Sequence, residues 1–417
     1  MIKPVLGSVL ARLWTTLTNL LVFMVAGHML GAEGLGAISL IVLGITLVQL
    51  LNNVVGGGAL VHLVPRAPLG ALLRPAYLWA GITAAVAGAV FFLPLVPEGT
   101  SPHVVILAFL QSLYSIHLSV LVGRKRFRVY NSIVAVHAAL LLLLFVLLVQ
   151  IPGRRNVESY VWACYAAFGA TLLLSTWAVF RASHPTVIHA GPGLLRRMVA
   201  QGLQVQSANA MQLLNYRLAY YLIEHFRGLA PLGIYSVATQ LAEGAWLVPR
   251  SLGLVLYGSV SNEVVADRQR SLTLTVFKMA VVSAAVAMVF ALLLPEALFS
   301  WLFGEEVHGI RPILALLAPG IVAMAASQAY SHYFSGVGAN KHNAIGSGIG
   351  LIITVVLGPF LVPLHGLSGA SATASLAYGA NAVYQGWVFN RLTGAPLADL
   401  LPNSADVERI RTAWSRI

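Results

Sequence analysis

The chain has 417 residues, of which 58% are hydrophobic and only 9% are charged, and its mean hydropathy is +0.83. So few charged side chains cannot cover a soluble globule of this size, and lipid must therefore be part of the solvent. The net charge of +12 would suit a nucleic-acid-binding protein as well as a membrane protein, and the positions of the basic residues must decide between these two classes.

Apolar runs of about twenty residues recur along the whole chain, the length that an α-helix needs to cross the hydrocarbon core of a bilayer. We therefore expect an all-α integral membrane protein with about twelve transmembrane helices. The breaks between the runs are rich in glycine and proline, for example Gly31 to Gly36 and Pro363 to Gly366. The expected helices lie near residues 5–29, 35–60, 71–96, 103–122, 129–151, 158–181, 200–225, 231–257, 271–303, 312–336, 343–364 and 367–391.

The first expected helix leads into the next one without a convincing cleavage site, so we expect it to be retained in the protein. The single cysteine, Cys164, lies inside an apolar run. The sequence therefore offers neither a disulfide framework nor a cysteine-based zinc motif. No P-loop, catalytic triad or pair of hydrolytic carboxylates is recognisable, so we expect no enzymatic activity, no cofactor and no metal site.

Basic residues alternate between the loops that join the expected helices. The even-numbered loops and the two ends of the chain hold most of them, whereas the odd-numbered loops hold Arg154, Arg155, Arg227 and Arg311. By the positive-inside rule both termini face the cytoplasm. The basic residues that mark the cytoplasmic side are Lys3, Arg66, Arg74, Arg124, Lys125, Arg126, Arg128, Arg181, Arg196, Arg197, Arg268, Arg270, Lys341, Arg391, Arg409, Arg411 and Arg416. This arrangement indicates a membrane protein and no nucleic-acid partner.

A weak internal repeat connects the two halves of the chain. The sequence Leu35 to Ser39, after the first expected helix, resembles Leu232 to Ser236, after the seventh. Gly123 to Asn131 and Gly336 to Asn343 also match, each as a glycine, a basic stretch and an asparagine. We therefore expect two pseudo-symmetric six-helix bundles, residues 1–190 and 191–392, around a central cavity, followed by a cytoplasmic tail at 393–417.

Nine short segments of the chain have distinctive residues: Leu214 to Arg217, Leu232 to Ala238, Leu241 to Glu243, Trp246 to Pro249, Gly27 to Gly36, Gly57 to Val61, Pro65-Arg66, Gly366 to Ala370 and Arg391 to Gly394. Together they resemble one known family, the polysaccharide-transporter branch of the multidrug, oligosaccharidyl-lipid and polysaccharide exporter (MOP) superfamily, which includes the O-antigen flippases. They extend over nearly the full chain. Two positions depart from the family pattern, since Ala219 stands where relatives often have an acid and Gly258 where they have a proline.

The resemblance implies a bacterial inner-membrane flippase that works by alternating access. Its substrate would be an oligosaccharide joined to undecaprenyl pyrophosphate, carried from the cytoplasmic to the outer leaflet for surface polysaccharide biosynthesis. The implied partners are this lipid-linked glycan, membrane lipid, a polysaccharide polymerase and glycosyltransferases of the same pathway, and a coupling ion, H⁺ or Na⁺.

The seventh expected helix is unusually polar for a membrane span, and polar groups cannot face lipid cheaply. Its amides and tyrosines suit sugar hydroxyls, and Arg217 can hold a phosphate through two donors. Arg217 and Glu243 lie at comparable depths on consecutive antiparallel helices, so we expect that the two side chains can form an ion pair. The expected substrate-binding residues are Arg12, Asn52, Asn53, Gln201, Gln204, Gln212, Asn215, Arg217, Tyr220 and Glu243.

Other interpretations of these residues stay open at the level of sequence. The polar groups could hydrogen-bond between helices and hold the bundle together, and Lys278 and Arg250 could extend to the cytoplasmic surface. An ion-coupled antiporter of drugs or metabolites from the same superfamily is the main functional alternative. A membrane glycosyltransferase or polymerase is a further one, but the expected outer loops are short.

Overall fold

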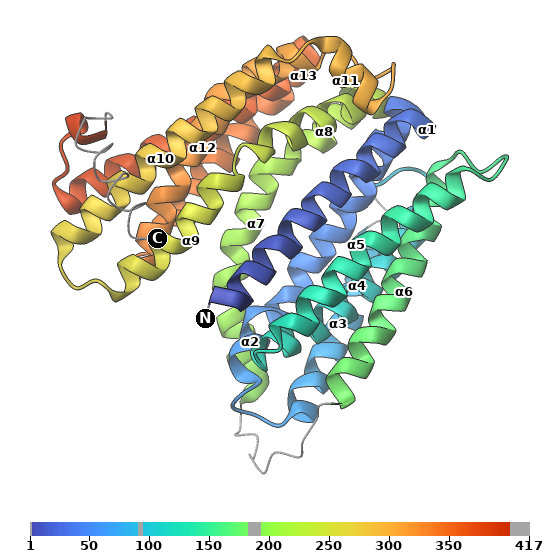
Figure 1. Ribbon diagram of the computed structural model, residues 1–417, viewed down its shortest axis with the longest axis horizontal. Helices are drawn as coiled ribbons and strands as arrows, with labels where there is room; N and C mark the ends of the chain where they lie inside the picture. The colour runs from blue at the N-terminus through green and yellow to red at the C-terminus, as the bar shows by residue number, and fades with distance from the viewer. Residues whose placement is uncertain (1, 91–94, 182–192, 401–417) are drawn as a thin grey trace. The chain divides into compact units, whose positions relative to one another are not determined.

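The computed structural model describes residues 2–90, 95–181 and 193–400, and every regular element in these ranges is helical (Figure 1). The expectation of an all-α protein is confirmed. The helices are α1 (Ile2–Gly56), α2 (Gly58–Leu63), α3 (Leu69–Val90), α4 (Ser101–Gly123), α5 (Phe127–Val149), α6 (Val157–Arg181), α7 (Leu194–Arg227), α8 (Leu229–Gly244), α9 (Leu247–Asn262), α10 (Ala266–Leu293), α11 (Glu296–Phe303), α12 (Ile310–Gly336), α13 (Lys341–Thr393) and the short 3₁₀ helix η1 (Leu397–Leu400).

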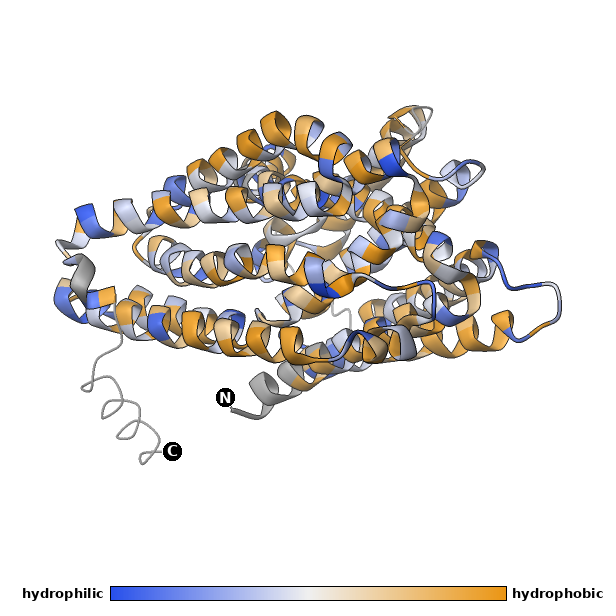
Figure 2. Ribbon diagram, turned by 90° about the horizontal axis from the view of Figure 1, so that it is seen from above, coloured by the Kyte–Doolittle hydropathy of each residue, from blue (hydrophilic) through white to orange (hydrophobic). Residues whose placement is uncertain are grey.

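Eight helical stretches in the described ranges are long and apolar enough to cross a membrane, and Figure 2 shows hydrophobic colour along most of the helix length. Two of them, Leu13–Leu63 and Lys341–Thr393, contain 51 and 53 residues and each includes a sharp break. When each of these counts as two spans, α7 and the run α8–α9 complete the twelve expected spans. The chain is a multi-pass membrane protein.

The breaks inside α1 and α13 each depend on one glycine. Gly31 has φ 70° and Gly366 has φ 57°, values that a glycine adopts without the steric cost that a Cβ would add. At the second break, a Cβ on Gly369 would lie 1.9 Å from the Leu361 carbonyl oxygen, so the two limbs of α13 nearly touch. Arg227 donates a 2.7 Å hydrogen bond to the Pro363 carbonyl at this break. The expected breaks at Gly31 and at Pro363 to Gly366 are thus confirmed.

Two expected helices are divided in the structure. The expected helix 231–257 becomes α8 and α9, separated by a tight turn in which Trp246 N–H bonds to the Glu243 carbonyl at 3.0 Å. Pro249 follows three residues later and has no N–H with which to continue the α-helical ladder through this turn. The expected helix 271–303 becomes α10 and α11. Leu294 precedes Pro295 and is extended, with φ −65° and ψ 137°, as a residue before proline prefers.

The described chain forms two compact units. Unit 1 comprises Met1–Ala210, Gly228–Ile234 and Phe299–His308. Within it, α4 packs against α1, α3 and α6, and α5 packs against α1 and α6. Unit 2 comprises Met211–Arg227, Tyr235–Leu298 and Gly309–Ile417, and within it α12 packs against α9, α10 and α13. The helix α7 is divided between the two units after Ala210.

The core of unit 2 near the ends of α9, α12 and α13 is rich in aromatic rings. Tyr330, Tyr333, Phe334 and Phe389 are each at most 7% exposed, and Phe389 lies 5.2 Å from Tyr330 and 5.0 Å from Tyr333 between ring centroids. Such pairs add to the free energy gained by burying their area. This core fixes one end of α9, α12 and α13 within unit 2.

The glycines of the sequence repeat occupy equivalent places in the two units. In unit 1 a Cβ on Gly123, at the end of α4, would lie 2.8 Å from Val64 Cβ, just after α2. In unit 2 a Cβ on Gly336, at the end of α12, would lie 2.7 Å from a methyl group of Val260, near the end of α9. Each glycine therefore permits the same close helix contact.

Candidate functional site

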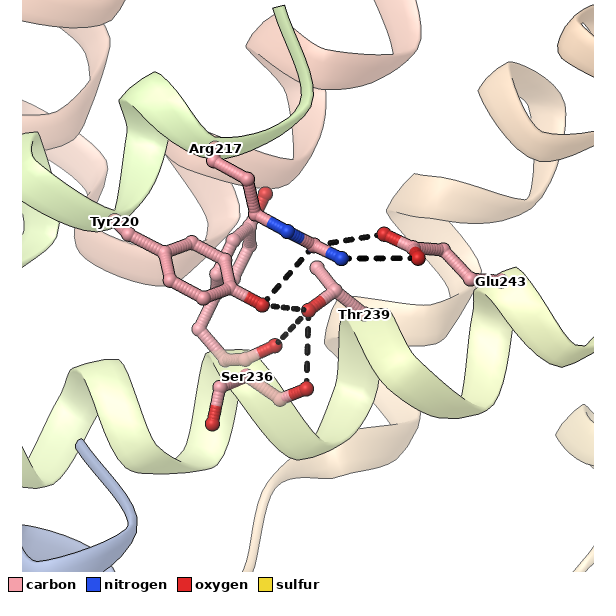
Figure 3. Close-up of polar contacts among 6 residues, drawn as sticks. Arg217, Tyr220, Ser236, Thr239 and Glu243 are labelled. Carbon is pink, nitrogen blue, oxygen red and sulfur yellow. Dashed lines mark hydrogen bonds and ion pairs between the residues drawn. The ribbon is translucent and has the colours of Figure 1, made fainter. Parts of the chain in front are cut away.

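Arg217 on α7 and Glu243 on α8 form a two-point ion pair in unit 2 (Figure 3). Arg217 Nη1 lies 2.7 Å from Glu243 Oε1, and Nη2 donates to Oε2 at 3.0 Å. The two side chains are 25% and 20% exposed. The expected pairing is therefore confirmed, and its geometry is the parallel arrangement that an arginine, but not a lysine, can make with a carboxylate.

A directed chain of hydrogen bonds leads from Arg217 into α8. Arg217 Nη1 donates to the Tyr220 hydroxyl at 3.1 Å, and Tyr220 lies 2.8 Å from Thr239 Oγ1. Thr239 Oγ1 donates to the carbonyls of Tyr235 and Ser236, both at 3.0 Å. Because carbonyls only accept and a guanidinium only donates, the Tyr220 hydroxyl must donate to Thr239. The chain holds the guanidinium in place from a second direction.

The contacts of Arg217 with described residues use three of the five N–H groups that a guanidinium carries. Two N–H groups therefore remain for an oxygen-rich ligand even while Glu243 stays bound. A ligand carrying an oxyanion could use these two donors first and then compete with Glu243 for the others. The site is therefore suited to binding an anion, with the Glu243 carboxylate as the competing group for Arg217.

Three aromatic rings lie beside the ion pair. The Tyr216 ring centroid is 5.5 Å from that of Trp246 and 5.4 Å from that of Tyr378. Trp246 is fully buried and its indole N–H donates to the Ile321 carbonyl at 3.0 Å, which fixes the ring. Gln212 donates to the Tyr216 hydroxyl at 2.9 Å. Trp246 and Tyr378 are buried and support the partly exposed Tyr216 ring, whose flat apolar face beside the Gln212 amide is suited to a sugar.

Arg250 on α9 also contacts this group, although from the sequence we expected it only to extend to the cytoplasmic surface. Its guanidinium carbon lies 5.4 Å from the centre of the Trp246 ring, and its side chain is exposed. The spacing of four residues between Trp246 and Arg250 at the start of a helix is the signal that could have indicated this contact.

The other expected residues of α7 differ in their exposure. Gln201 and Gln212 are exposed, which a polar group inside a membrane span tolerates only beside water or other polar groups. Gln206 is 8% exposed and accepts a hydrogen bond from Asn209 at 3.2 Å. The side chains of Gln204 and Arg12 lie outside the described residues.

Two of the expected lining residues, Asn215 and Asn52, are buried in this structure. Asn215 is 3% exposed and accepts a 3.1 Å hydrogen bond from Thr354 on α13, so it ties two helices together. Asn52 is fully buried, and neither atom of its amide has a hydrogen-bond partner among the described residues. Its neighbour Asn53 accepts from Gln49 at 3.0 Å. Lys278 is also buried, at 8% exposure, and does not extend to the surface.

Histidines inside unit 1 contact hydroxyl and aromatic groups. His117 lies 2.6 Å from the Tyr77 hydroxyl and 3.0 Å from Ser175 Oγ, and His137 lies 3.2 Å from Thr171 Oγ1. The described part of the chain contains no group of three or more His, Cys, Asp or Glu residues that could hold a metal ion. The ion pair on α7 and α8 is therefore the stronger candidate site.

No family model and no curated protein matches this chain. Solved structures do resemble it. An inward-facing multidrug resistance MATE family transporter of the MOP superfamily superposes with a TM-score of 0.71 at 16% identity, covering 91% of this chain and 94% of the other. Lipid II flippase MurJ, in an inward closed conformation, gives a TM-score of 0.68 at 13% identity, covering 96% of this chain and 89% of the other.

An outward-facing MATE transporter gives a lower TM-score, 0.64, at 15% identity, with 94% of this chain and 95% of the other covered. Identities this low establish the fold alone. The chain therefore has the fold of a MOP-superfamily transporter.

Proposed function

We propose that this protein is a flippase that carries an oligosaccharide linked to undecaprenyl pyrophosphate across the bacterial cytoplasmic membrane, for the synthesis of a surface polysaccharide. The observation that carries the proposal is the two-point Arg217–Glu243 pair beside an aromatic group within membrane-spanning helices. The family resemblance of the sequence supports it, and so does the shared fold with a lipid II flippase.

Arg217 would hold the pyrophosphate, because its planar guanidinium offers phosphate oxygens two donors at once. Arg250, whose guanidinium lies over the Trp246 ring, would add a second positive charge. The Tyr216 ring, held against the buried rings of Trp246 and Tyr378, would support the first sugar. Arg12 remains a candidate for a further phosphate contact, and Gln201 and Gln212 for sugar hydroxyls.

Competition between substrate and Glu243 would couple binding to a change of state. In the empty carrier Arg217 is occupied by Glu243, and a bound anion would weaken that pair. A ligand shifts a conformational equilibrium only through such a difference in contacts between two states. Glu243 freed in this way could take up the coupling ion, H⁺ or Na⁺, which would return the carrier to its first state. Both termini would face the cytoplasm, where the glycosyltransferases act, and the polymerase would receive the product outside.

The test is a clean deletion of this gene in its own host, with no substitute flippase present. We expect the lipid-linked glycan to accumulate in the cytoplasmic leaflet and surface polysaccharide to be lost. Complementation by Arg217→Lys should restore little export and Arg217→Ala almost none at equal membrane abundance, whereas the exposed control Arg268→Ala should restore it fully. Normal surface polysaccharide in the deletion strain would reject the proposal.

Export of cationic drugs is the second candidate, because Glu243 is an acid within a membrane span and the fold is shared with multidrug MATE transporters. A cation would compete with Arg217 for Glu243, the reverse of the first case. Drug resistance lost in Glu243→Gln but kept in Arg217→Gln would favour this alternative. Glycan export that depends more on Arg217 would favour the flippase.

A further inference from the structure

The basic loop between α4 and α5 is attached to the end of α6 within unit 1. Arg124 Nη1 donates to the Val179 carbonyl at 3.1 Å, and Arg126 Nη1 donates to the Ala178 carbonyl at 2.7 Å. Both carbonyls lie in the last turn of α6, where no helical N–H can reach them. We call residues 124–128 the basic turn. Two of its arginines therefore cap the C-terminus of α6.

The conformation of the basic turn is one that glycine normally adopts. Lys125 has φ 56° and is the only residue other than glycine with a positive φ in the described part of the chain. Its N–H bonds to the Val122 carbonyl at 2.8 Å, and the Arg126 N–H bonds to the Leu121 carbonyl at 2.9 Å. These are the two hydrogen bonds of a Schellman helix ending. A Cβ makes the left-handed conformation at its centre sterically costly.

The equivalent turn of unit 2 does contain glycine at this position. Gly338 has φ 76°, its N–H bonds to the Ser335 carbonyl at 3.3 Å, and the Ala339 N–H bonds to the Phe334 carbonyl at 2.7 Å. The repeat thus aligns two turns of the same geometry with different side chains, Val337, Gly338 and Ala339 in unit 2 and Arg124, Lys125 and Arg126 in unit 1. Unit 1 therefore keeps a lysine where the backbone favours glycine, and the positive charge is the property that glycine lacks.

The positive charge of the basic turn is largely uncompensated. The ion pairs formed by described residues do not include Lys125, Arg126 or Arg128, and the side chains of Lys125 and Arg128 are exposed. Partial burial, and then the neighbouring charge of Arg126, lower the pKa of the Arg124 guanidinium. Like charges held this close attract an anion, because an anion reduces their mutual repulsion.

An exposed apolar stripe on α6 ends beside the basic turn. Leu173, Trp177 and Phe180 are 73%, 60% and 51% exposed, and their spacing of four and three residues places them on one helix face. The exposed Arg181 ends this stripe, with its guanidinium carbon 4.8 Å from the centre of the Trp177 ring. Tryptophan and arginine at the end of a membrane span are typical of the depth at which lipid headgroups lie.

We propose that the basic turn and the end of α6 form a binding site for an anionic phospholipid of the bilayer. Arg126 contacts α6 three residues before Arg181, about 4.5 Å along the helix axis. The headgroup phosphate would bind to Arg181 and Lys125, and one acyl chain would lie along Leu173 and Trp177. The site is built by unit 1 alone, whereas the Arg217–Glu243 pair belongs to unit 2. Its assignment to the cytoplasmic leaflet rests on the orientation in the proposed function.

The test measures the affinity of the purified protein in detergent micelles for phosphatidylglycerol, by native mass spectrometry, with phosphatidylcholine as the lipid without net charge. We expect phosphatidylglycerol to bind more than about tenfold more tightly, because at least two basic side chains contact its phosphate. Arg181→Gln should weaken the binding of phosphatidylglycerol about fivefold, the contribution of one basic side chain, and leave that of phosphatidylcholine unchanged.

The matched control is Arg391→Gln in unit 2. Arg391 also lies over a tryptophan, 5.6 Å from the centre of the Trp387 ring, but the equivalent turn of its unit has Gly338 in place of a lysine. The change in affinity for phosphatidylglycerol should be less than about twofold. An equal loss in Arg391→Gln and Arg181→Gln would show that any exposed Trp–Arg pair binds the lipid, and it would overturn the role of the basic turn.

Lys125→Gly separates the charge of the lysine from its effect on the backbone. The variant removes the Cβ that makes the turn costly, so we expect the midpoint of thermal unfolding without added lipid to rise. Its affinity for phosphatidylglycerol should nevertheless fall about fivefold, whereas Lys125→Arg should keep the affinity. Unchanged affinity in both Lys125→Gly and Arg181→Gln would overturn the site, and neither variant is expected to prevent folding.

Competing ligands distinguish the bilayer phospholipid from other anions. Inorganic phosphate at millimolar concentration should not displace phosphatidylglycerol, because it has no acyl chain to lie along α6. Displacement by phosphate would reveal a site for a free anion and reject the lipid. Undecaprenyl pyrophosphate that displaces phosphatidylglycerol at a lower concentration than phosphatidylglycerol itself would make this a site for the cargo and reject the phospholipid. The binding assay requires no transport, so the phospholipid site stands or fails separately from the flippase.

Discussion

The Arg217–Glu243 pair can be tested by a double-mutant cycle on stability. We expect Arg217→Ala and Glu243→Ala each to destabilise the protein, because each leaves the partner's charge partly buried and unpaired. The double variant should be less destabilised than the sum of the single effects. The excess is the coupling energy between the two side chains.

The expected magnitude follows from the exposure of the two groups. Removing one partner of a fully buried pair costs about 3–5 kcal/mol, and exposed pairs contribute about 0.2–1 kcal/mol. With 25% and 20% of the side chains exposed, the pair lies between these limits. We expect single losses of about 1–3 kcal/mol and a coupling of about 1–2 kcal/mol.

The assay is reversible unfolding of the purified protein by SDS in mixed micelles, with the four members of the cycle measured side by side. The control cycle uses Glu263 and Arg268, which are 3.8 Å apart, with the arginine side chain 74% exposed. Its coupling should be close to zero. A coupling between Arg217 and Glu243 no larger than that of the control would refute the pairing and with it the competition mechanism.

Three further predictions concern orientation and packing. A single cysteine at Ser101 should react with an impermeant reagent in intact cells, and one at Ser404 should not; the reverse pattern would overturn the assigned orientation. Gly202→Ala should destabilise by about 1–3 kcal/mol, because its Cβ would lie 1.7 Å from the Val54 carbonyl oxygen; Gly169→Ala should be neutral or stabilising in the same unfolding assay. Trp246→Phe should cost about 1–3 kcal/mol through the lost hydrogen bond to the Ile321 carbonyl and the smaller ring at a fully buried position, and an unchanged unfolding midpoint would contradict this.

The sequence alone predicted the membrane character, the helical class and the position of the two glycine turns. These features depend on local properties of the chain, such as the length of apolar runs and the conformations open to glycine. The pairing of Arg217 with Glu243 was also within reach, because two charges at matching depth on consecutive antiparallel helices have few other partners in a membrane.

Other features depended on which helices pack together, and the sequence does not carry that information locally. Asn52 and Asn215 have the same polar side chain as residues on an exposed face, and only the neighbouring helices bury them. Arg250 is exposed, but its contact with the Trp246 ring depends on the turn before α9 and could not be inferred from its position in the sequence. The repeated glycines at Gly36 and Gly233 were visible as a pattern, but their mutual contact, in which a Cβ on Gly233 would lie 3.0 Å from the Gly36 nitrogen, was not, because it joins residues almost two hundred positions apart.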